Sequence, residues 1–165
     1  LSMQGLPMNV IARRVRMEGL EAFLGRIRKK NNVNVVYRDA SAKEIVDLLR
    51  NKKFVGIMPD QDMDSVSGVF VDFFGVRAWT PSGPAILNLL TGASIVPCFM
   101  MRKAFGHEVL IENAIELAKT GDRKEDIIEN TRRCAEVIEK HIRKFPDHWV
   151  WFHDRWKTKE PRNNV

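Results

Sequence analysis

The sequence has no apolar run of the ~18 residues that a membrane-spanning helix needs, and no charged-then-apolar segment typical of a signal peptide opens it. It has only two cysteines, Cys98 and Cys134, without the paired spacing of a metal site or a disulfide framework. We expect both to be reduced core residues. Repeats and low-complexity segments are also missing, and taken as it stands the sequence predicts a soluble or peripheral protein.

The length of the chain bounds its organisation. With 165 residues and 44% hydrophobic content, it can bury most of its apolar surface in one domain with a single core. Its first residue is Leu1 and not methionine, and a patterned segment follows almost at once. We therefore expect a fragment of a longer protein.

Positive charge is concentrated at the start. The first 53 residues hold twelve Lys and Arg against five Asp and Glu, which gives +7, so the remainder carries −1 of the net +6. Such a bias suits an anionic partner such as lipid headgroups, phosphates or nucleic acid, and it equally suits a solvated basic face. The chain lacks a helix-turn-helix, zinc-finger or RNA-recognition motif, so we do not expect nucleic acid.

Short apolar runs alternate with segments whose apolar residues recur every three or four positions. The expected strands are residues 9–12, 34–37, 54–58, 94–101 and 107–112, and the expected helices lie around residues 20–27, 45–49, 85–90 and 127–142. Residues 41–44 predict a capping box, and the run 54–58 predicts a strand buried on both faces. This alternation predicts an α/β fold with a largely parallel sheet flanked by helices.

Three acids follow the predicted strand 54–58, in the loop Pro59-Asp60-Gln61-Asp62-Met63-Asp64. Ligands of open α/β sheets bind at such strand ends. Alternating acids can hold a cation, although the glycine and distant glutamate of an EF-hand are absent, or they can form a turn with ion pairs. We do not expect a metal site.

Two further clusters have both structural and functional interpretations. The cations of Gly25-Arg26-Ile27-Arg28-Lys29-Lys30 close a predicted helix, where the helix dipole favours them for stability alone. Aromatic residues gather at 73–79 and 149–152, where they can pack in a core or form an acyl-chain wall or membrane contact.

His107 and Glu112 fit a His-x-x-x-x-Glu pattern that would suit a catalytic base and its partner. On a strand, residues five apart point to opposite faces, so the two side chains cannot readily converge on one hydroxyl. We interpret this pair as a coincidence of spacing.

Six segments, in order, resemble the lipid A biosynthesis (lauroyl/myristoyl) acyltransferase family, and together they span nearly the whole chain. They are Gly25-Arg26-Ile27-Arg28, Pro59-Asp60-Gln61-Asp62, residues 69–75, 80–85 and 92–97, and the aromatic segment 148–157. The resemblance implies a glycerolphosphate-acyltransferase-like fold truncated at its N-terminus, with an acyltransferase domain over residues 1–157 and a flexible tail over 158–165.

The resemblance also implies a reaction: transfer of a fatty acyl chain from an acyl carrier protein thioester to a hydroxyl of a lipid A precursor. The place would be an anionic membrane surface at the cytoplasmic face of a Gram-negative inner membrane. We expect no cofactor, because a thioester already carries an activated acyl group. The alternative is a non-catalytic domain that binds anionic lipid.

Site residues follow from the matched motifs. Arg26 matches the functional arginine of the family and Asp60 its functional aspartate, which we expect to orient Arg26 or a histidine. We expect Arg13, Arg14, Arg28 and Asp62 to bind substrate. The family's His-x-x-x-x-Asp/Glu motif precedes the segment that resembles Gly5-Leu6-Pro7 and is missing here, as is the N-terminal anchor, so we expect the isolated chain to be inactive.

Overall fold

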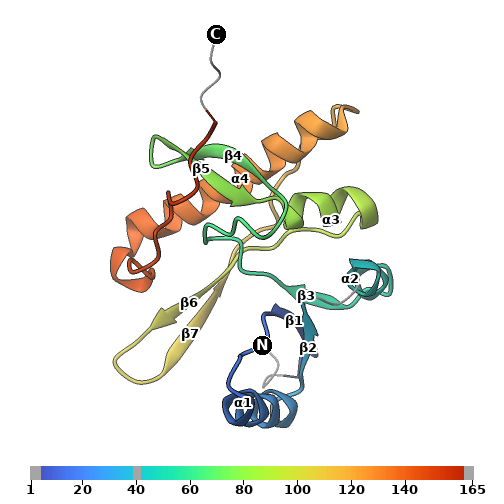
Figure 1. Ribbon diagram of the computed structural model, residues 1–165, viewed down its shortest axis with the longest axis vertical. Helices are drawn as coiled ribbons and strands as arrows, with labels where there is room; N and C mark the ends of the chain where they lie inside the picture. The colour runs from blue at the N-terminus through green and yellow to red at the C-terminus, as the bar shows by residue number, and fades with distance from the viewer. Residues whose placement is uncertain (1–4, 39–41, 162–165) are drawn as a thin grey trace. The chain divides into compact units, whose positions relative to one another are not determined.

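The computed structural model describes residues 5–38 and 42–161, and the chain divides into two compact units, Leu1–Met58 and Pro59–Val165 (Figure 1). We call them the N-terminal and the C-terminal unit. Strands and helices occur in both, which confirms the mixed α/β class. Chain length favours one core, whereas the structure has two compact units whose border in the sequence is Pro59.

The N-terminal unit holds a parallel three-stranded sheet in the order β2-β1-β3. Its strands are β1 (Met8–Ala12), β2 (Val33–Tyr37) and β3 (Phe54–Gly56), and the helices α1 (Glu18–Lys30) and α2 (Ala42–Arg50) connect them. Parallel neighbours require a crossover of this kind, as the alternating pattern predicts. A polar ladder crosses the sheet: Asn34 Nδ2 donates to Asn9 Oδ1 at 2.9 Å, and Asn9 Nδ2 donates to the Phe54 carbonyl at 2.8 Å.

The charges of α1 follow its dipole, with Glu18 and Glu21 in the first turn and three cations in the last. The helix ends where Asn31 Nδ2 donates to the Ile27 carbonyl at 2.9 Å and Asn32 adopts a positive φ of 54°. For α2, the expected capping serine lies outside the residues that the structure describes.

The prediction that residues 54–58 form a strand buried on both faces is wrong. The strand β3 has three residues and pairs with β1 at one edge of the described sheet. Phe54 is 54% exposed, and Met58, beyond the strand, is also exposed. An edge position leaves one side of a strand without a neighbour, so an apolar run alone does not establish burial.

The C-terminal unit begins with a hairpin of β4 (Gly68–Phe73) and β5 (Val76–Pro81). Its two-residue loop, Phe74-Gly75, has φ of 56° and 77°, and two positive φ angles match the right-handed twist of the strands. Phe74 N donates to Glu139 Oε2 at 2.7 Å, which holds this unfavourable position. At Gly68, a Cβ atom would lie 2.7 Å from both the Thr80 carbonyl oxygen and the Trp79 ring.

Helices α3 (Gly83–Thr91) and α4 (Arg123–Lys144) appear where the sequence predicts them, and α4 packs on β4. Pro84 stands in the first turn of α3, and Gly92 caps it in the left-handed conformation. Asp122 caps α4 by accepting from Lys124 N and Glu125 N. The apolar core of this unit joins the hairpin to α4 and contains Val71, Phe73, Ala78, Ala135 and Ile142.

A second antiparallel pair joins β6 (Cys98–Arg102) to β7 (His107–Ile111). The predicted strand 107–112 is confirmed, but the predicted buried strand 94–101 begins only at Cys98, after Pro97, and its outward face is exposed. Cys98 is accordingly exposed and not a core residue, whereas Cys134 is buried. Both thiols are free.

Within the described residues, the predicted parallel arrangement is therefore confirmed for the sheet of the N-terminal unit and not for the strands of the C-terminal unit. The connections of the two hairpins in the C-terminal unit are two and four residues long, and connections this short can join only antiparallel strands. A short 3-10 helix, η2 (Pro146–His148), follows α4 and leads into the C-terminal aromatic segment.

Candidate functional site

The loop after β3 is held by the C-terminal aromatic segment. Asp60 is half-buried, and Trp149 Nε1 donates to its Oδ2 at 3.3 Å. The Trp149 ring packs against the core of the unit, with its centroid 6.0 Å from that of Phe73. The structure thus joins two of the motifs that suggest the family, 89 residues apart in sequence.

Asp62 serves the loop internally. It is only 7% exposed, and its carboxylate accepts from Thr158 N at 2.8 Å and from Thr158 Oγ1 at 2.7 Å. Its backbone N–H donates to His153 Nε2 at 2.8 Å, so that nitrogen of His153 acts as an acceptor. This arrangement fixes the loop backbone, and the predicted contact of Asp62 with substrate stays a prediction.

Arg155 is a buried cation that the sequence analysis missed. It is 1% exposed; Nη1 donates to the Trp79 carbonyl at 2.7 Å and Nη2 to Thr80 Oγ1 at 2.6 Å. Its guanidinium lies 4.7 Å from the Phe73 ring centroid. Burial lowers the pKa of Arg155, and the charges of Asp62 and Asp60 oppose that shift. The sequence signal that could have indicated this buried role is the position of Arg155 as a single arginine within the aromatic segment 148–157.

The remaining acid of the loop lies at the surface. Asp64 is exposed and pairs with Lys157 Nζ at 3.4 Å. Before it, the Met63 carbonyl accepts from Trp79 Nε1 at 3.1 Å. Thr158 and Glu160 belong to the expected tail, yet Thr158 bonds Asp62, and Glu160 pairs with Arg77 at 2.8 Å. The three acids of the loop therefore have three different environments.

In the N-terminal unit, Glu21 organises two of the predicted substrate-binding arginines. Tyr37 Oη donates to Glu21 Oε1 at 2.6 Å, and Val15 N donates to Oε2 at 2.7 Å. Arg28 Nη1 lies 3.7 Å from Oε1, and the Arg14 guanidinium lies 3.9 Å from the Tyr37 ring centroid. The hydrogen bond from Tyr37 lowers the pKa of Glu21 most, and the one from Val15 N lowers it further. The Tyr37–Glu21 hydrogen bond also raises the pKa of Tyr37.

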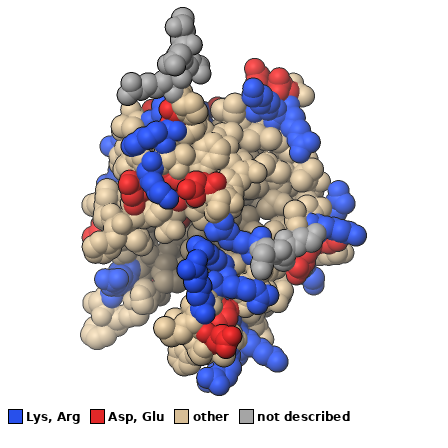
Figure 2. All heavy atoms as spheres, in the orientation of Figure 1, with Lys and Arg blue, Asp and Glu red and all other residues tan. Residues whose placement is uncertain are grey.

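The other two predicted arginines of this unit, Arg13 and Arg26, have exposed side chains. Figure 2 shows Lys and Arg side chains gathered over the region where Figure 1 places α1, around a small acidic group. The structure brings Arg14 and Arg28 to one cluster. The expected orientation of Arg26 by Asp60 stays a prediction, because the two residues belong to different units.

The four histidines have distinct surroundings. His141 is buried and stacked on Phe99 at 3.7 Å between ring centroids, and burial lowers its pKa. His148 Nδ1 lies 3.0 Å from Asp147 Oδ1, while its Nε2 faces the Arg102 carbonyl at 3.4 Å. His153 is engaged by the Asp62 N–H, and His107 is exposed at the start of β7.

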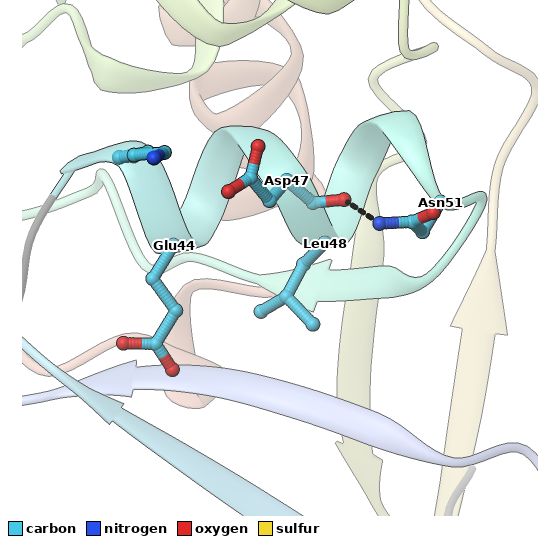
Figure 3. A pocket seen from close by; sticks show the side chains of 5 residues that line it. Glu44, Asp47, Leu48 and Asn51 are labelled. Atoms are coloured by element: carbon cyan, nitrogen blue, oxygen red, sulfur yellow. Dashed lines mark hydrogen bonds between the residues drawn. The ribbon is translucent and has the colours of Figure 1, made fainter.

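An open hollow lies along α2 in the N-terminal unit, and Figure 3 shows the side chains that line it. Asn51 Nδ2 donates there to the Asp47 carbonyl at 2.8 Å. The lining comes from α2 and the residue after it, and none of the predicted site residues contributes. In residues 5–38 and 42–161, no three His, Cys, Asp or Glu side chains are grouped to hold a metal ion, and no helix is long and apolar enough to span a membrane.

Comparison with known proteins identifies the class. The sequence model of the bacterial lipid A biosynthesis acyltransferase family matches residues 1–158, so the chain belongs to this family. The lipid A biosynthesis palmitoleoyltransferase of Escherichia coli strain K12 is 30% identical over 155 residues, which cover 92% of this chain and 45% of that protein. The lauroyltransferase of the same strain is 32% identical over 119 residues, covering 71% and 38%.

A relative with another named acceptor also matches. The phosphatidylinositol mannoside acyltransferase of Mycobacterium tuberculosis strain CDC 1551 / Oshkosh is 29% identical over 114 residues, covering 68% of this chain and 34% of that protein. The chain spans less than half the length of these curated relatives.

Proposed function

We propose that this protein transfers a fatty acyl chain from an acyl carrier protein thioester to a hydroxyl of a lipid A precursor, in lipopolysaccharide biosynthesis. The observation that carries the proposal is the family match over residues 1–158. The names of the two Escherichia coli relatives support acyl transfer and lipid A. The proposed place is the cytoplasmic face of the inner membrane.

The reaction needs no cofactor in this proposal. The acceptor hydroxyl oxygen forms an ester bond with the thioester carbonyl carbon, the carbon–sulfur bond breaks, and the hydroxyl proton passes through a general base to the leaving thiolate, which becomes the thiol. The carbonyl oxygen gains negative charge in the transition state, so a fixed cation nearby lowers the barrier.

Arg26 supplies that positive charge in the proposal, facing either the oxyanion or a phosphate of the acceptor. Its exposed side chain on α1 supports this role, because no packing function competes for it. Arg13, Arg14 and Arg28 would bind acceptor phosphates, for which the guanidinium fork is well suited. Glu21 and Tyr37 hold Arg14 and Arg28 in one cluster.

Asp60 is the proposed functional acid of the loop, acting as an orienting carboxylate. The test compares Asp60→Asn with Asp64→Asn in the full-length protein, with an acyl carrier protein thioester and a lipid A precursor as substrates. We expect Asp60→Asn to reduce turnover severely. Asp64→Asn is the matched control and should change it little, because Asp64 is exposed and pairs only at the surface. Equal, mild effects would reduce the loop to a structural turn.

A second candidate function is anionic-lipid binding without catalysis, favoured by the +7 charge of residues 1–53. Binding of the protein to anionic and neutral vesicles would be compared at rising salt. We expect a preference for anionic vesicles that weakens as salt screens charges over a Debye length of roughly 8 to 10 Å. Salt-independent binding would point to the aromatic side chains, and turnover by the full-length protein would exclude the non-catalytic function.

A further inference from the structure

We propose that Trp149 is a positioning residue that orients the Asp60 carboxylate through its indole N–H. The inference rests on the proposed function of Asp60 and adds a residue to it. Trp149 Nε1 donates to Asp60 Oδ2 at 3.3 Å. Within the described residues of the C-terminal unit, the other oxygen, Oδ1, accepts no hydrogen bond, so it is available to a substrate or to a second catalytic group.

The donor is itself held in place. The Trp149 ring packs against the apolar core, where its centroid lies 6.0 Å from that of Phe73, and Trp151 meets it edge-on at 4.8 Å. A ring fixed on two sides cannot turn away without disturbing its neighbours. Its N–H therefore points in a defined direction, and hydrogen bonds to charged acceptors are stronger than neutral ones.

The loop that carries Asp60 is fixed just beyond it. Asp62 is held on its carboxylate by Thr158 and on its N–H by His153, and the Met63 carbonyl accepts from Trp79. These contacts fix the backbone but leave the Asp60 side chain free to choose a rotamer. The hydrogen bond from the indole N–H of Trp149 selects that rotamer. The Asp62 contacts thus position the loop backbone, and Trp149 orients the Asp60 carboxylate.

Two tryptophan variants separate orientation of Asp60 by the Trp149 N–H from a purely structural role of the Trp149 ring. Trp149→Phe keeps an aromatic ring against the core and removes only the N–H and part of the ring. Trp151→Phe is the matched control, since it keeps an aromatic ring beside Trp149 and removes an N–H that donates to the Pro146 carbonyl at 2.6 Å and not to Asp60. The two substitutions remove the same group from neighbouring tryptophans in the same segment.

The kinetic experiment is a double-mutant cycle on acyl transfer by the full-length protein, with thermal unfolding to verify that every variant is folded. We expect Trp149→Phe to lower kcat about tenfold with little change in KM, and Trp151→Phe to leave kcat within about twofold. In the Asp60→Ala background, adding Trp149→Phe should cost nothing further, because residues that act through one another are not additive. A tenfold loss in both backgrounds would overturn the inference.

A spectroscopic readout separates this inference from the proposed function. With 15N-labelled tryptophan, the indole N–H resonance of Trp149 should shift on Asp60→Ala, while that of Trp151 stays in place. An unchanged Trp149 resonance would show that the Trp149–Asp60 hydrogen bond does not form, and it would overturn the inference. Near-normal turnover of Asp60→Ala together with a shifted Trp149 resonance would instead remove Asp60 from the reaction, leaving the contact real and its catalytic purpose refuted.

Discussion

The two units treat charge in opposite ways. The N-terminal unit carries +7, and its arginines Arg13 and Arg26 lie exposed at the surface. The C-terminal unit carries −1 and buries charged groups, with Asp62 bonded to a residue 96 positions away and Arg155 to residues 75 and 76 positions away. One unit therefore exposes its charge to solvent, while the other uses charge to fix its own loops.

The largest effect should come from the presented charge. Arg26→Ala in the full-length protein is expected to lower acyl transfer by about 10² to 10³, the range typical of losing one group that stabilises an oxyanion. The unfolding temperature should stay unchanged because the side chain is exposed. Lys29→Ala, on the same exposed helix, serves as the control. Near-normal turnover of the Arg26 variant would contradict the proposal that the exposed charge of the N-terminal unit acts in acyl transfer.

Next in size is a buried charge. Arg155→Met keeps an unbranched apolar stem but removes the guanidinium, which leaves the Trp79 carbonyl and Thr80 hydroxyl without this donor. We expect the free energy of unfolding to fall by about 3 kcal/mol, measured by urea denaturation with tryptophan fluorescence. Arg77→Met removes an exposed pair with Glu160 and should cost less than ~1 kcal/mol. Similar costs for both variants would show that burial of Arg155 contributes nothing.

A smaller effect concerns acid stability. Glu129 accepts hydrogen bonds from Arg132 and Arg133, which lower its pKa from 4.5 to about 2. Its stabilisation is therefore complete above about pH 4.5 and is lost as pH falls toward 2, where the folded protein also binds the proton. These side chains are about a third exposed, so the total should stay below ~1 kcal/mol.

Glu129→Gln should flatten this part of the curve of unfolding free energy against pH. The control is Glu108→Gln, which breaks an ion pair with Lys103 whose two side chains are both more than half exposed. Because the pKa of Glu21 is also lowered, Glu21→Gln should remove a further part of the slope, from the N-terminal unit. Identical slopes in wild type and Glu129→Gln would contradict the prediction.

The smallest effect is expected at His107. His107→Ala should keep most of the acyl transfer activity of the full-length protein, since His107 starts β7 and Glu112 follows its last residue, Ile111, and residues five apart along an extended chain point to opposite sides. Turnover measured beside Arg26→Ala provides the scale. A loss comparable to that of Arg26→Ala would place the catalytic base in the C-terminal unit and reverse the comparison.

The sequence predicted the positions of β1, β2 and α1 in the N-terminal unit, although not the exposure of β3, because these strands and this helix are local patterns. The runs at 9–12 and 34–37 and the helix around Leu20–Ile27 depend on spacing within a few residues. The hairpin β4–β5 lacked such a signal, since its turn places Phe74 at a positive φ in place of the usual Asn or Gly. That turn depends on Glu139, which is 65 residues away in the chain.

The candidate site was predictable only in part, for the same reason. The resemblance gave Asp60 a functional role and Asp62 a substrate-binding role, but it did not predict their partners, which are Trp149 for Asp60 and Thr158 for Asp62. Arg155 stood within a matched segment, but its burial depends on the hairpin that carries Trp79 and Thr80. Contacts between residues 75 or more positions apart leave no local pattern.

Gly68 shows that one position can affect a loop that it does not contact directly, through the residue packed against it. A side chain there would collide with the Trp79 ring, the same residue whose indole N–H holds the Met63 carbonyl and whose own carbonyl receives Arg155. In a saturation mutagenesis scan scored by activity, Gly68 should therefore tolerate almost no replacement, although it has no side chain of its own. Such intolerance would show that the conformation of the loop around Asp60 depends on the space that Gly68 leaves for the Trp79 ring.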